Sequence, residues 1–325
     1  MSRTLNTTAL LTAALLPACL ANAQTKRQLR PKRKPPRLPD TVRVERDVPY
    51  AGTKNPRQTL DLFLPKIRKT DKPLPVIAFI HGGGWRNGNK QRGWREVIPY
   101  VASGQYAGVS IAYRLSGEVT WPAQIHDCKA AVRWIRANAK KYEFDPDRIG
   151  VMGTSAGGHL VAMLGTAGDV PSLEGKLGKH TGLSSRVTCV VDFFGPSELL
   201  TMNNFPSRIN HDAARSPESR LIGGPIQKNK AKSRNASPIT HVSKGDAPFL
   251  IVHGSKDPLV PFDQSAQLHK RLQSVSVPSI LIEMDGGRHG GFRSRVLDGR
   301  VRKFFDRHLR GANVEISDKA ITATE

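Results

Sequence analysis

Residues 148–159 constrain the fold of this chain more than any other stretch. An apolar run over 149–152 enters a G-x-S-x-G pattern formed by Gly153, Ser155 and Gly157, and a helix-compatible run follows. A strand that turns this sharply into a helix strains the backbone at the central residue and exposes its side chain. A Cβ at either glycine would collide with the neighbouring strand or helix. The pattern therefore predicts an exposed Ser155 hydroxyl beside a helix N-terminus, a position that suits a nucleophile.

Short apolar runs alternate with helical segments along most of the chain. Several later runs, such as 75–80, are continuous, as in strands covered on both faces. Between them, 123–141, 264–273 and 296–309 carry apolar residues at three- and four-residue steps, which predicts helices packed on a sheet. This alternation predicts an α/β fold with a mostly parallel, doubly wound, eight-stranded sheet and helices on both faces. The strand candidates are 42–48, 59–64, 75–80, 108–113, 148–152, 187–194, 249–252 and 279–283.

The first 23 residues have the pattern of a cleavable secretory signal. Arg3 supplies the positive region, residues 9–16 the apolar region, and the A-x-A sequence at 21–23 the cleavage site, which predicts a cut after residue 23. An alternative is a lipoprotein site with the lipid on Cys19, although Pro17 fits that pattern poorly. The apolar stretch is too short to span a bilayer. Both interpretations predict a protein that works outside the cytoplasm, secreted or periplasmic.

Composition shifts divide the rest of the chain. Residues 24–40 are a basic, proline-rich linker, 41–310 form the globular domain, and 311–325 are a polar tail expected to be flexible. Two stretches rich in Gly, Ser, Asn and Pro, 165–186 and 195–248, interrupt the α/β pattern where the carboxyl ends of strands are expected. Ligands bind at that edge of an open sheet. These insertions are either a small lid near the site or ordinary surface loops.

The chain is strongly basic, with a formal net charge of +23. The first 40 residues carry eight basic side chains and one acidic side chain, so +16 remains on the rest. Such a field attracts polyanions, among them anionic polysaccharide and lipid head groups, and it also serves solubility. Specific nucleic-acid binding is not expected, because the basic residues are dispersed and lack an aromatic stacking platform.

Cysteines and potential metal ligands are sparse. Beyond the signal, only Cys128 and Cys189 remain. Two cysteines make no disulfide framework, and we expect both to be separate buried side chains, although pairing stays open. His, Cys and carboxylates nowhere cluster at ligand spacing, so neither a metal nor an organic cofactor is expected.

Three consecutive glycines follow the strand candidate 75–80, in the sequence His81-Gly-Gly-Gly-Trp85. A loop without side chains can aim peptide N–H groups at one point, where an oxygen becomes negative during acyl transfer. A phosphate-binding loop is the alternative, but both the G-x-G-x-x-G spacing and a G-K-[ST] ending are missing. We expect His81 to brace the loop rather than to catalyse.

A general base and an acid that orients it are expected after the last two strands. Asp257 follows the strand candidate 249–252, and His289 lies between glycines after the final strand candidate. Two other acids compete with Asp257: Asp263, which we interpret as the start of a helix, and Asp285, which is very close in sequence to His289. We therefore select Asp257 as the acid and His289 as the base.

These residues together predict a Ser-His-Asp triad. An imidazole, whose ordinary pKa is about 6.5, can take the Ser155 proton and return it to the leaving group, while Asp257 stabilises the imidazolium. The chain order Ser, Asp, His is the one used by α/β-hydrolases. The predicted donors of the oxyanion hole are the N–H groups of Gly83, Gly84 and Ala156.

The motifs at 81–85, 153–157, 253–257 and around His289 resemble the α/β-hydrolase esterases of the hormone-sensitive-lipase-like group. Within it, the chain is most similar to the secreted BD-FAE-type esterase/lipase branch, over residues 47–309. The resemblance implies the α/β-hydrolase fold, the same triad and oxyanion donors, and removal of acetyl or feruloyl esters from plant polysaccharides. Separately, the two short insertions suggest a fairly open site, which favours short or bulky aromatic acyl groups over long fatty chains.

One residue departs from the family pattern. Arg288 stands directly before His289, where relatives more often have a small residue, and it either depresses the pKa of the imidazole or binds an acidic substrate. Two functions compete with a serine ester hydrolase: a serine peptidase of the prolyl-oligopeptidase kind, and a non-catalytic binding protein on a hydrolase fold. The H-G-G-G sequence argues against the first, and the complete set of triad residues argues against the second.

Overall fold

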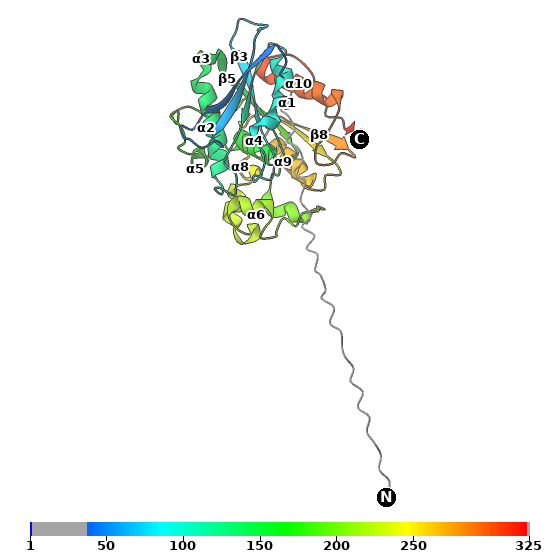
Figure 1. Ribbon diagram of the computed structural model, residues 1–325. Helices are drawn as coiled ribbons and strands as arrows, with labels where there is room; N and C mark the ends of the chain where they lie inside the picture. The colour runs from blue at the N-terminus through cyan, green and yellow to red at the C-terminus, as the bar shows by residue number, and fades with distance from the viewer. Residues whose placement is uncertain (2–37, 324–325) are drawn as a thin grey trace. The chain divides into compact units, whose positions relative to one another are not determined.

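A single nine-stranded sheet forms the centre of the molecule, in the order β1-β2-β4-β3-β5-β6-β7-β8-β9 (Figure 1). The structure is a computed structural model that describes residues 1 and 38–323. β2 pairs antiparallel with β1 and with β4, and all other neighbours are parallel. The strands are β1 (Val42–Pro49), β2 (Thr59–Pro65), β3 (Leu74–Ile80), β4 (Ala107–Ile111), β5 (Phe144–Thr154), β6 (Cys189–Phe193), β7 (Phe249–Gly254), β8 (Ser279–Asp285) and β9 (Ile321–Thr322).

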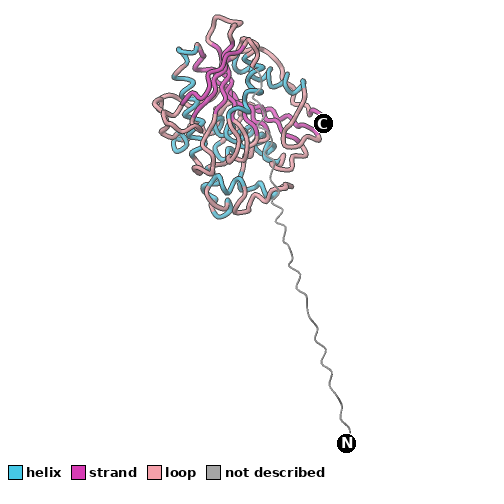
Figure 2. The backbone as a smooth tube through the Cα atoms, in the orientation of Figure 1, coloured by secondary structure: helices cyan, strands magenta, loops and turns pink. Residues whose placement is uncertain are grey.

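Helices cover both faces of this sheet (Figure 2). α2, α4 and α9 bury apolar side chains on one face, and α1 and α10 bury theirs on the other. The helices are α1 (Trp94–Val101), α2 (Ala123–Ala137), α3 (Ala139–Tyr142), α4 (Ala156–Thr166), α5 (Pro171–Glu174), α6 (Pro217–Ile222), α7 (Lys230–Asn235), α8 (Pro238–His241), α9 (Asp263–Ser274) and α10 (Arg295–Arg310), with 3-10 turns η1 (Lys90–Gly93), η2 (Leu199–Asn204) and η3 (Ile226–Lys228).

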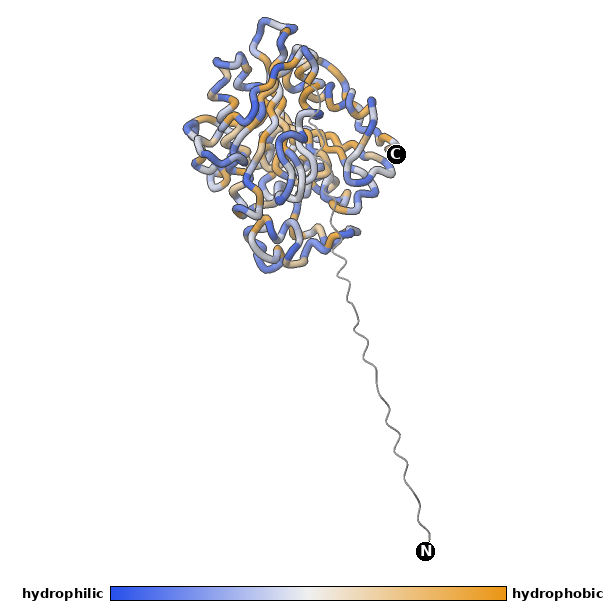
Figure 3. The backbone as a smooth tube through the Cα atoms, viewed as in Figure 1, coloured by the Kyte–Doolittle hydropathy of each residue, from blue (hydrophilic) through white to orange (hydrophobic). Residues whose placement is uncertain are grey.

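The continuous apolar runs reflect this two-sided burial. In β3, Val76 and Ala78 face the cluster under α2 and α4, whereas Ile77 and Phe79 face the cluster under α1 and α10. All four side chains are at most 2% exposed. Hydrophobic residues therefore concentrate along the sheet (Figure 3). The α/β-hydrolase fold predicted from the sequence is confirmed.

The structure corrects three details of the expected elements. The sheet has nine strands rather than eight, because Ile321–Thr322 in the tail pairs parallel to the end of β8. A two-residue strand has no periodicity to detect. The helix expected over 123–141 is two helices, α2 and α3, which meet at Asn138, where the backbone (φ −98°, ψ 11°) departs from the helical conformation. Helix α1, which contains Pro99, was not among the predicted elements.

The two insertions lie at opposite edges of the sheet. Residues 195–248 follow the carboxyl end of β6, as expected, and form the separate layer that contains α6 in Figure 1. The expectation for 165–186 is wrong, because α4 first carries the chain back to the amino edge, where β6 begins. There Glu174 pairs with Lys129 and Arg133 of α2.

Other sequence expectations can be placed only in part. The signal, Cys19 and the linker up to residue 37 lie outside the described residues, whereas the tail is described up to residue 323. Cys128 on α2 and Cys189 on β6 are both buried and unpaired. Across residues 38–323, no helix has the length and apolar character needed to cross a membrane.

Candidate active site

Four loops that carry the predicted site residues leave the carboxyl edge of the sheet. They follow β3, β5, β7 and β8, and β6 lies between β5 and β7. The loop after β8 must therefore reach across two strands to meet the loop after β5. The fold brings together segments that lie as far apart in sequence as Gly83 and His289.

Ser155 lies at the sharp turn between β5 and α4. Its backbone has φ 56° and ψ −121°, a sparsely populated conformation that costs about 1–3 kcal/mol. A Cβ on Gly153 would come within 2.3 Å of the Gly157 carbonyl oxygen, and a Cβ on Gly157 within 2.1 Å of the Ile80 oxygen. The glycine pattern is thus required by close approach of α4 to both strands.

Ser155, His289 and Asp257 contact one another in series. Ser155 Oγ lies 2.9 Å from His289 Nε2, and His289 Nδ1 lies 2.6 Å from Asp257 Oδ2. The imidazole is 18% exposed, while the carboxylate is fully buried. This arrangement can carry a proton from a hydroxyl to an imidazole whose positive charge is stabilised by a carboxylate.

The Asp257 carboxylate is held on both oxygens. Oδ1 accepts hydrogen bonds from the N–H groups of Leu259 and Val260, at 2.8 and 3.1 Å. Oδ2 is shared between His289 and His253 Nε2, the latter at 3.1 Å. Burial opposes the charge, but these hydrogen bonds outweigh it and hold the pKa of Asp257 well below its ordinary value.

His253 is a contact of Asp257 that the sequence analysis did not assign. It is buried on β7, and its Nδ1 lies 2.7 Å from Ser265 Oγ on α9. The ring thus fixes the carboxylate relative to both elements. Its signal was present, because His253 begins the motif that ends with Asp257.

Phe194, directly after β6, supports the His289 loop and was also not predicted. The two rings lie 4.7 Å apart between centroids. A Cβ on Gly290 would lie 2.9 Å from the Phe194 ring, and Gly290 has φ 83°. Glycine next to His289 therefore allows the loop to pass close over β6.

The glycine loop after β3 lies beside Ser155. Gly83 has φ 123°, and a Cβ there would come within 2.2 Å of the Asn87 oxygen. Gly83, Gly84 and Ala156 border the same cavity as Ser155. Within the described chain, their three N–H groups donate no hydrogen bond, so they are free to bind a developing oxyanion.

Buried histidines hold the ends of this loop. The Trp85 indole donates to His159 Nδ1 at 3.1 Å, and His159 Nε2 donates to the Ala236 carbonyl at 2.6 Å. His81 lies 4.4 Å from the Tyr113 ring in a stacked arrangement, and the Tyr113 hydroxyl donates to the His81 carbonyl. Both features fit the bracing role expected of His81.

The cavity next to Ser155 has a volume of about 250 Å³. This is below the 300–1,000 Å³ typical of drug-sized ligand sites, so it suits a small ligand. The second insertion supplies part of its wall, which indicates a lid-like position for this segment. The lining residues are Gly83, Gly84, Trp85, Ser155, Ala156, Pro196, Ile209, Pro217, Glu218, Leu259, Val260 and His289.

The remaining candidates lie away from the contact series. Asp263 begins α9, as expected, and Asp285 is an exposed residue that ends β8. The Arg288 side chain is exposed. Among the described residues, no three His, Cys, Asp or Glu side chains are arranged to hold a metal ion.

Comparison with known sequences matches the chain to a protein family. The BD-FAE family matches residues 60–272, which include Ser155 and Asp257 but not His289. Two curated relatives from Mycobacterium tuberculosis are esterase LipC, 33% identical over 73% of this chain, and esterase LipQ, 30% identical over 79%. The chain spans only 57% and 61% of the lengths of these two relatives.

Solved structures give the same fold. A truncated carbohydrate esterase from gut microbiota matches with a TM-score of 0.77 and 33% identity, covering 83% of this chain and 98% of that one. A bifunctional GH43-CE protein of Bacteroides eggerthii matches with a TM-score of 0.75 and 36% identity, covering 82% of this chain and 38% of that one.

Proposed function

The chain belongs to the BD-FAE family, and from this premise we propose that it is a carboxylesterase with Ser155 as its nucleophile. The observation that carries the proposal is the contact series from Ser155 Oγ through His289 to the Asp257 carboxylate. The esterase relatives support the same reaction class over a serine peptidase. The intact contact series argues against a purely binding role.

The proposed reaction has two halves. Ser155 Oγ attacks the ester carbonyl carbon while His289 Nε2 takes its proton, and the N–H groups of Gly83, Gly84 and Ala156 stabilise the oxyanion. The C–O bond to the alcohol then breaks, and His289 returns the proton to the departing oxygen. In the second half, His289 activates a water molecule that releases the acid from Ser155.

The proposed substrates are esters with short or aromatic acyl groups, including acetyl or feruloyl esters of polysaccharides. The small, largely apolar cavity supports a compact acyl group. The structural neighbour described as a carbohydrate esterase supports a polysaccharide as the alcohol part of the substrate.

We also propose an exported protein whose basic surface holds it near anionic or acetylated polysaccharide. The signal-like residues 1–23 and the net charge of +23 support this placement. Cleavage predicts that the exported chain begins at Gln24, which N-terminal sequencing can test; retention of a lipid on Cys19 is the competing outcome.

Replacement of Ser155 by alanine tests the proposed reaction. We expect turnover of p-nitrophenyl acetate to fall by about 10⁴-fold or more, because the covalent intermediate cannot form. An organophosphate should label Ser155 of the wild-type protein, as located by mass spectrometry. Ser184→Ala, at an exposed serine, is the matched control and should retain both properties. Full turnover in the Ser155→Ala variant would refute the proposal.

A further inference from the structure

A second pocket, with a volume of about 200 Å³, lies at the amino edge of the sheet. Its lining includes the segment that leads into β3 and a residue just before β4. The strands β4, β3 and β5 run parallel side by side from this edge. Ser155 and the layer that contains α6 follow the carboxyl ends of strands, at the other edge (Figure 1). The pocket therefore has no part in the proposed reaction.

Positive charge and hydrogen-bond donors dominate the lining of this pocket, which we call the basic pocket. Each of its polar side chains has an N–H or O–H group, and no carboxylate is among them. These side chains belong to Lys69, Thr70, Lys72, Gln105, Arg148 and Arg310. Such a lining is complementary to the negative charge and the lone pairs of an anion.

Three other hollows of the described chain combine arginine or lysine with carboxylates in their linings. The carboxylates are Glu96 and Asp298 in the first hollow, Asp257 and Asp263 in the second, and Glu315 in the third. Their cations thus have negative charges within the same hollow. Among these four cavities, the basic pocket alone has a lining without negative charge, so it gains most from a bound anion.

The two arginines of the basic pocket are held by carboxylates outside its lining. Arg148 Nε donates to Asp145 Oδ2 at 2.6 Å. Arg310 Nη1 donates to Asp306 Oδ1, also at 2.6 Å. Because a guanidinium group has five N–H donors, both side chains keep donors for a ligand while their positions are fixed.

The two lysines differ from the arginines, because they have no ion pair among the described residues. Both side chains are exposed, and neither pairs with Asp71 of the same loop. Their backbone is nevertheless fixed. The N–H group of Lys69 donates to the Gly104 carbonyl at 2.9 Å, and that of Lys72 donates to Thr70 Oγ at 3.1 Å. The ammonium groups are therefore placed at the pocket and free to contact a ligand.

We propose that the basic pocket binds a phosphate group, either as the free ion or as the terminal phosphate of a larger molecule. Four cations with two carboxylate partners leave two positive charges unmatched. A carboxylate would supply only one negative charge, whereas a phosphate group carries about −1.5 to −2 at pH 7. Lysine and arginine both bind phosphate, lysine as a point charge and arginine through paired N–H groups. This assigns the protein a binding function separate from ester hydrolysis.

Equilibrium dialysis of radiolabelled phosphate against the full chain tests the proposal. It is carried out at pH 8 in 0.1 M NaCl, where attraction between exposed charges is screened beyond about 10 Å. We expect wild-type protein to bind phosphate at least roughly 10-fold more tightly than acetate, which is added as a competitor. The double variant Lys69→Ala/Lys72→Ala should bind phosphate roughly 10-fold or more weakly.

The matched control is the double variant Lys230→Ala/Lys232→Ala, which removes the same charge from exposed positions of α7. It should keep the wild-type affinity within about 2-fold, because these lysines act only through the screened general field. An equal loss of affinity in the two double variants overturns the proposal, as does acetate that competes as well as phosphate does. The comparison of the two anions on wild-type protein stands even if a variant fails to fold.

Two further arms separate the pocket from the candidate active site and identify the source of the phosphate. Ser155→Ala should bind phosphate as the wild type does, and a loss there would place the ion at the active site and overturn the proposal. Displacement of the labelled ion by glucose 1-phosphate supports a phosphate carried on a larger molecule. Displacement by unlabelled phosphate alone supports the free ion. None of these measurements depends on ester hydrolysis, so the proposed function is tested independently.

Discussion

Two histidines beside the glycine loop are kept neutral by burial. Burial lowers the pKa of His81 to about 4 and that of His159 to about 4. His159 needs its neutral form, because Nδ1 accepts the Trp85 hydrogen bond while Nε2 donates to Ala236. In the unfolded chain both imidazoles have ordinary pKa values near 6.5. As the pH falls from about 6.5 to about 4, the unfolded chain takes up protons that the folded chain does not. The free energy of unfolding therefore falls by about 3 kcal/mol for each histidine.

Asp192 makes stability depend on pH in the opposite direction to the two histidines, over nearly the same pH range. It is fully buried on β6; Oδ1 accepts from the Gly195 N–H, and Oδ2 has no partner in the described chain. Burial raises the pKa of Asp192 to about 7. The folded protein therefore keeps a proton that the unfolded chain releases above about pH 4. Stability from this residue is lost as the pH rises from about 4 to about 7.

Asp192→Asn should separate the two effects. The variant removes a buried charge above pH 7 but matches the neutral acid below pH 4. We expect it to raise the free energy of unfolding by about 2–4 kcal/mol at pH 8 and to have little effect at pH 4. Urea unfolding followed by tryptophan fluorescence at pH 4, 6 and 8 measures this. Asp71→Asn, at an exposed aspartate, is the control; a difference in the Asp192 variant that does not change with pH contradicts the assignment.

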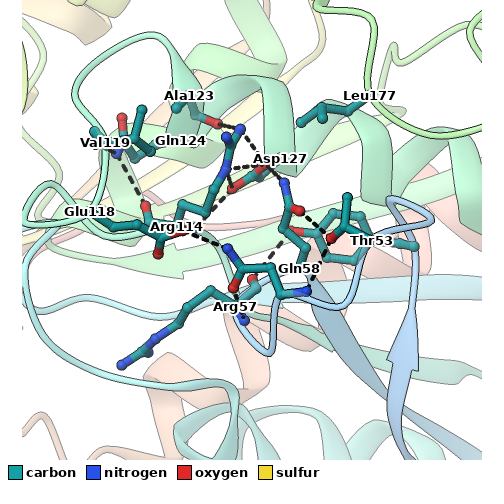
Figure 4. A network of polar contacts seen from close by, with 12 residues as sticks. Thr53, Arg57, Gln58, Arg114, Glu118, Val119, Ala123, Gln124, Asp127 and Leu177 are labelled. Carbon is teal, nitrogen blue, oxygen red and sulfur yellow. Dashed lines mark hydrogen bonds and ion pairs between the residues drawn. The ribbon is translucent and has the colours of Figure 1, made fainter.

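At the scale of secondary-structure elements, one buried carboxylate links helix α2 to the loop before it and to β2 (Figure 4). Asp127 accepts from the side chain and the N–H group of Arg114, and from the side chain of Gln58, which directly precedes β2. Tyr113, next to Arg114, bonds to the His81 carbonyl. The position of α2 is thereby connected to the glycine loop of the candidate site.

Asp127→Asn should destabilise the domain. The change leaves the Arg114 guanidinium without its buried counter-charge, and breaking such a pair costs about 3–5 kcal/mol. Asp169→Asn breaks the exposed ion pair with Arg186 and should cost less than about 1 kcal/mol. Chemical unfolding of both variants measures the contrast. Equal effects would show that the Asp127 network contributes no more than a surface pair.

The sequence predicts elements well where local pattern and burial agree. All eight predicted strands are present, and the continuous apolar runs of β2, β3, β4 and β7 correspond to strands that are buried along their whole length. The candidate triad was predictable because glycines mark the turns that carry Ser155 and His289. Phe194 had no such signal, since its contact with the His289 ring depends on how the loops after β6 and β8 fold against each other. β9 was not predicted, because a strand of two residues is too short to show an alternating or continuous apolar pattern.

At the scale of the whole molecule, positive charge dominates. The net charge is +23, of which +16 falls after residue 40. Two of these cations, Arg208 and Lys256, are exposed and line an open hollow of about 480 Å³ that also borders Asp257. Anionic polymer held by the general field would thus find local cations next to the candidate active site.

We expect the protein to bind polygalacturonate at low salt and to be released as salt is raised. Attraction between exposed charges is screened beyond about 10 Å at 0.1 M ionic strength, so most binding should be lost between roughly 0.05 and 0.3 M NaCl. Co-sedimentation with the polymer across that range measures the effect. Turnover of p-nitrophenyl acetate, a small neutral ester, serves as the internal control and should change little, because the field does not act on an uncharged substrate. Binding that persists at roughly 0.5 M salt, or that is equally strong on a neutral xylan, would mean that the positive charge serves solubility rather than attachment.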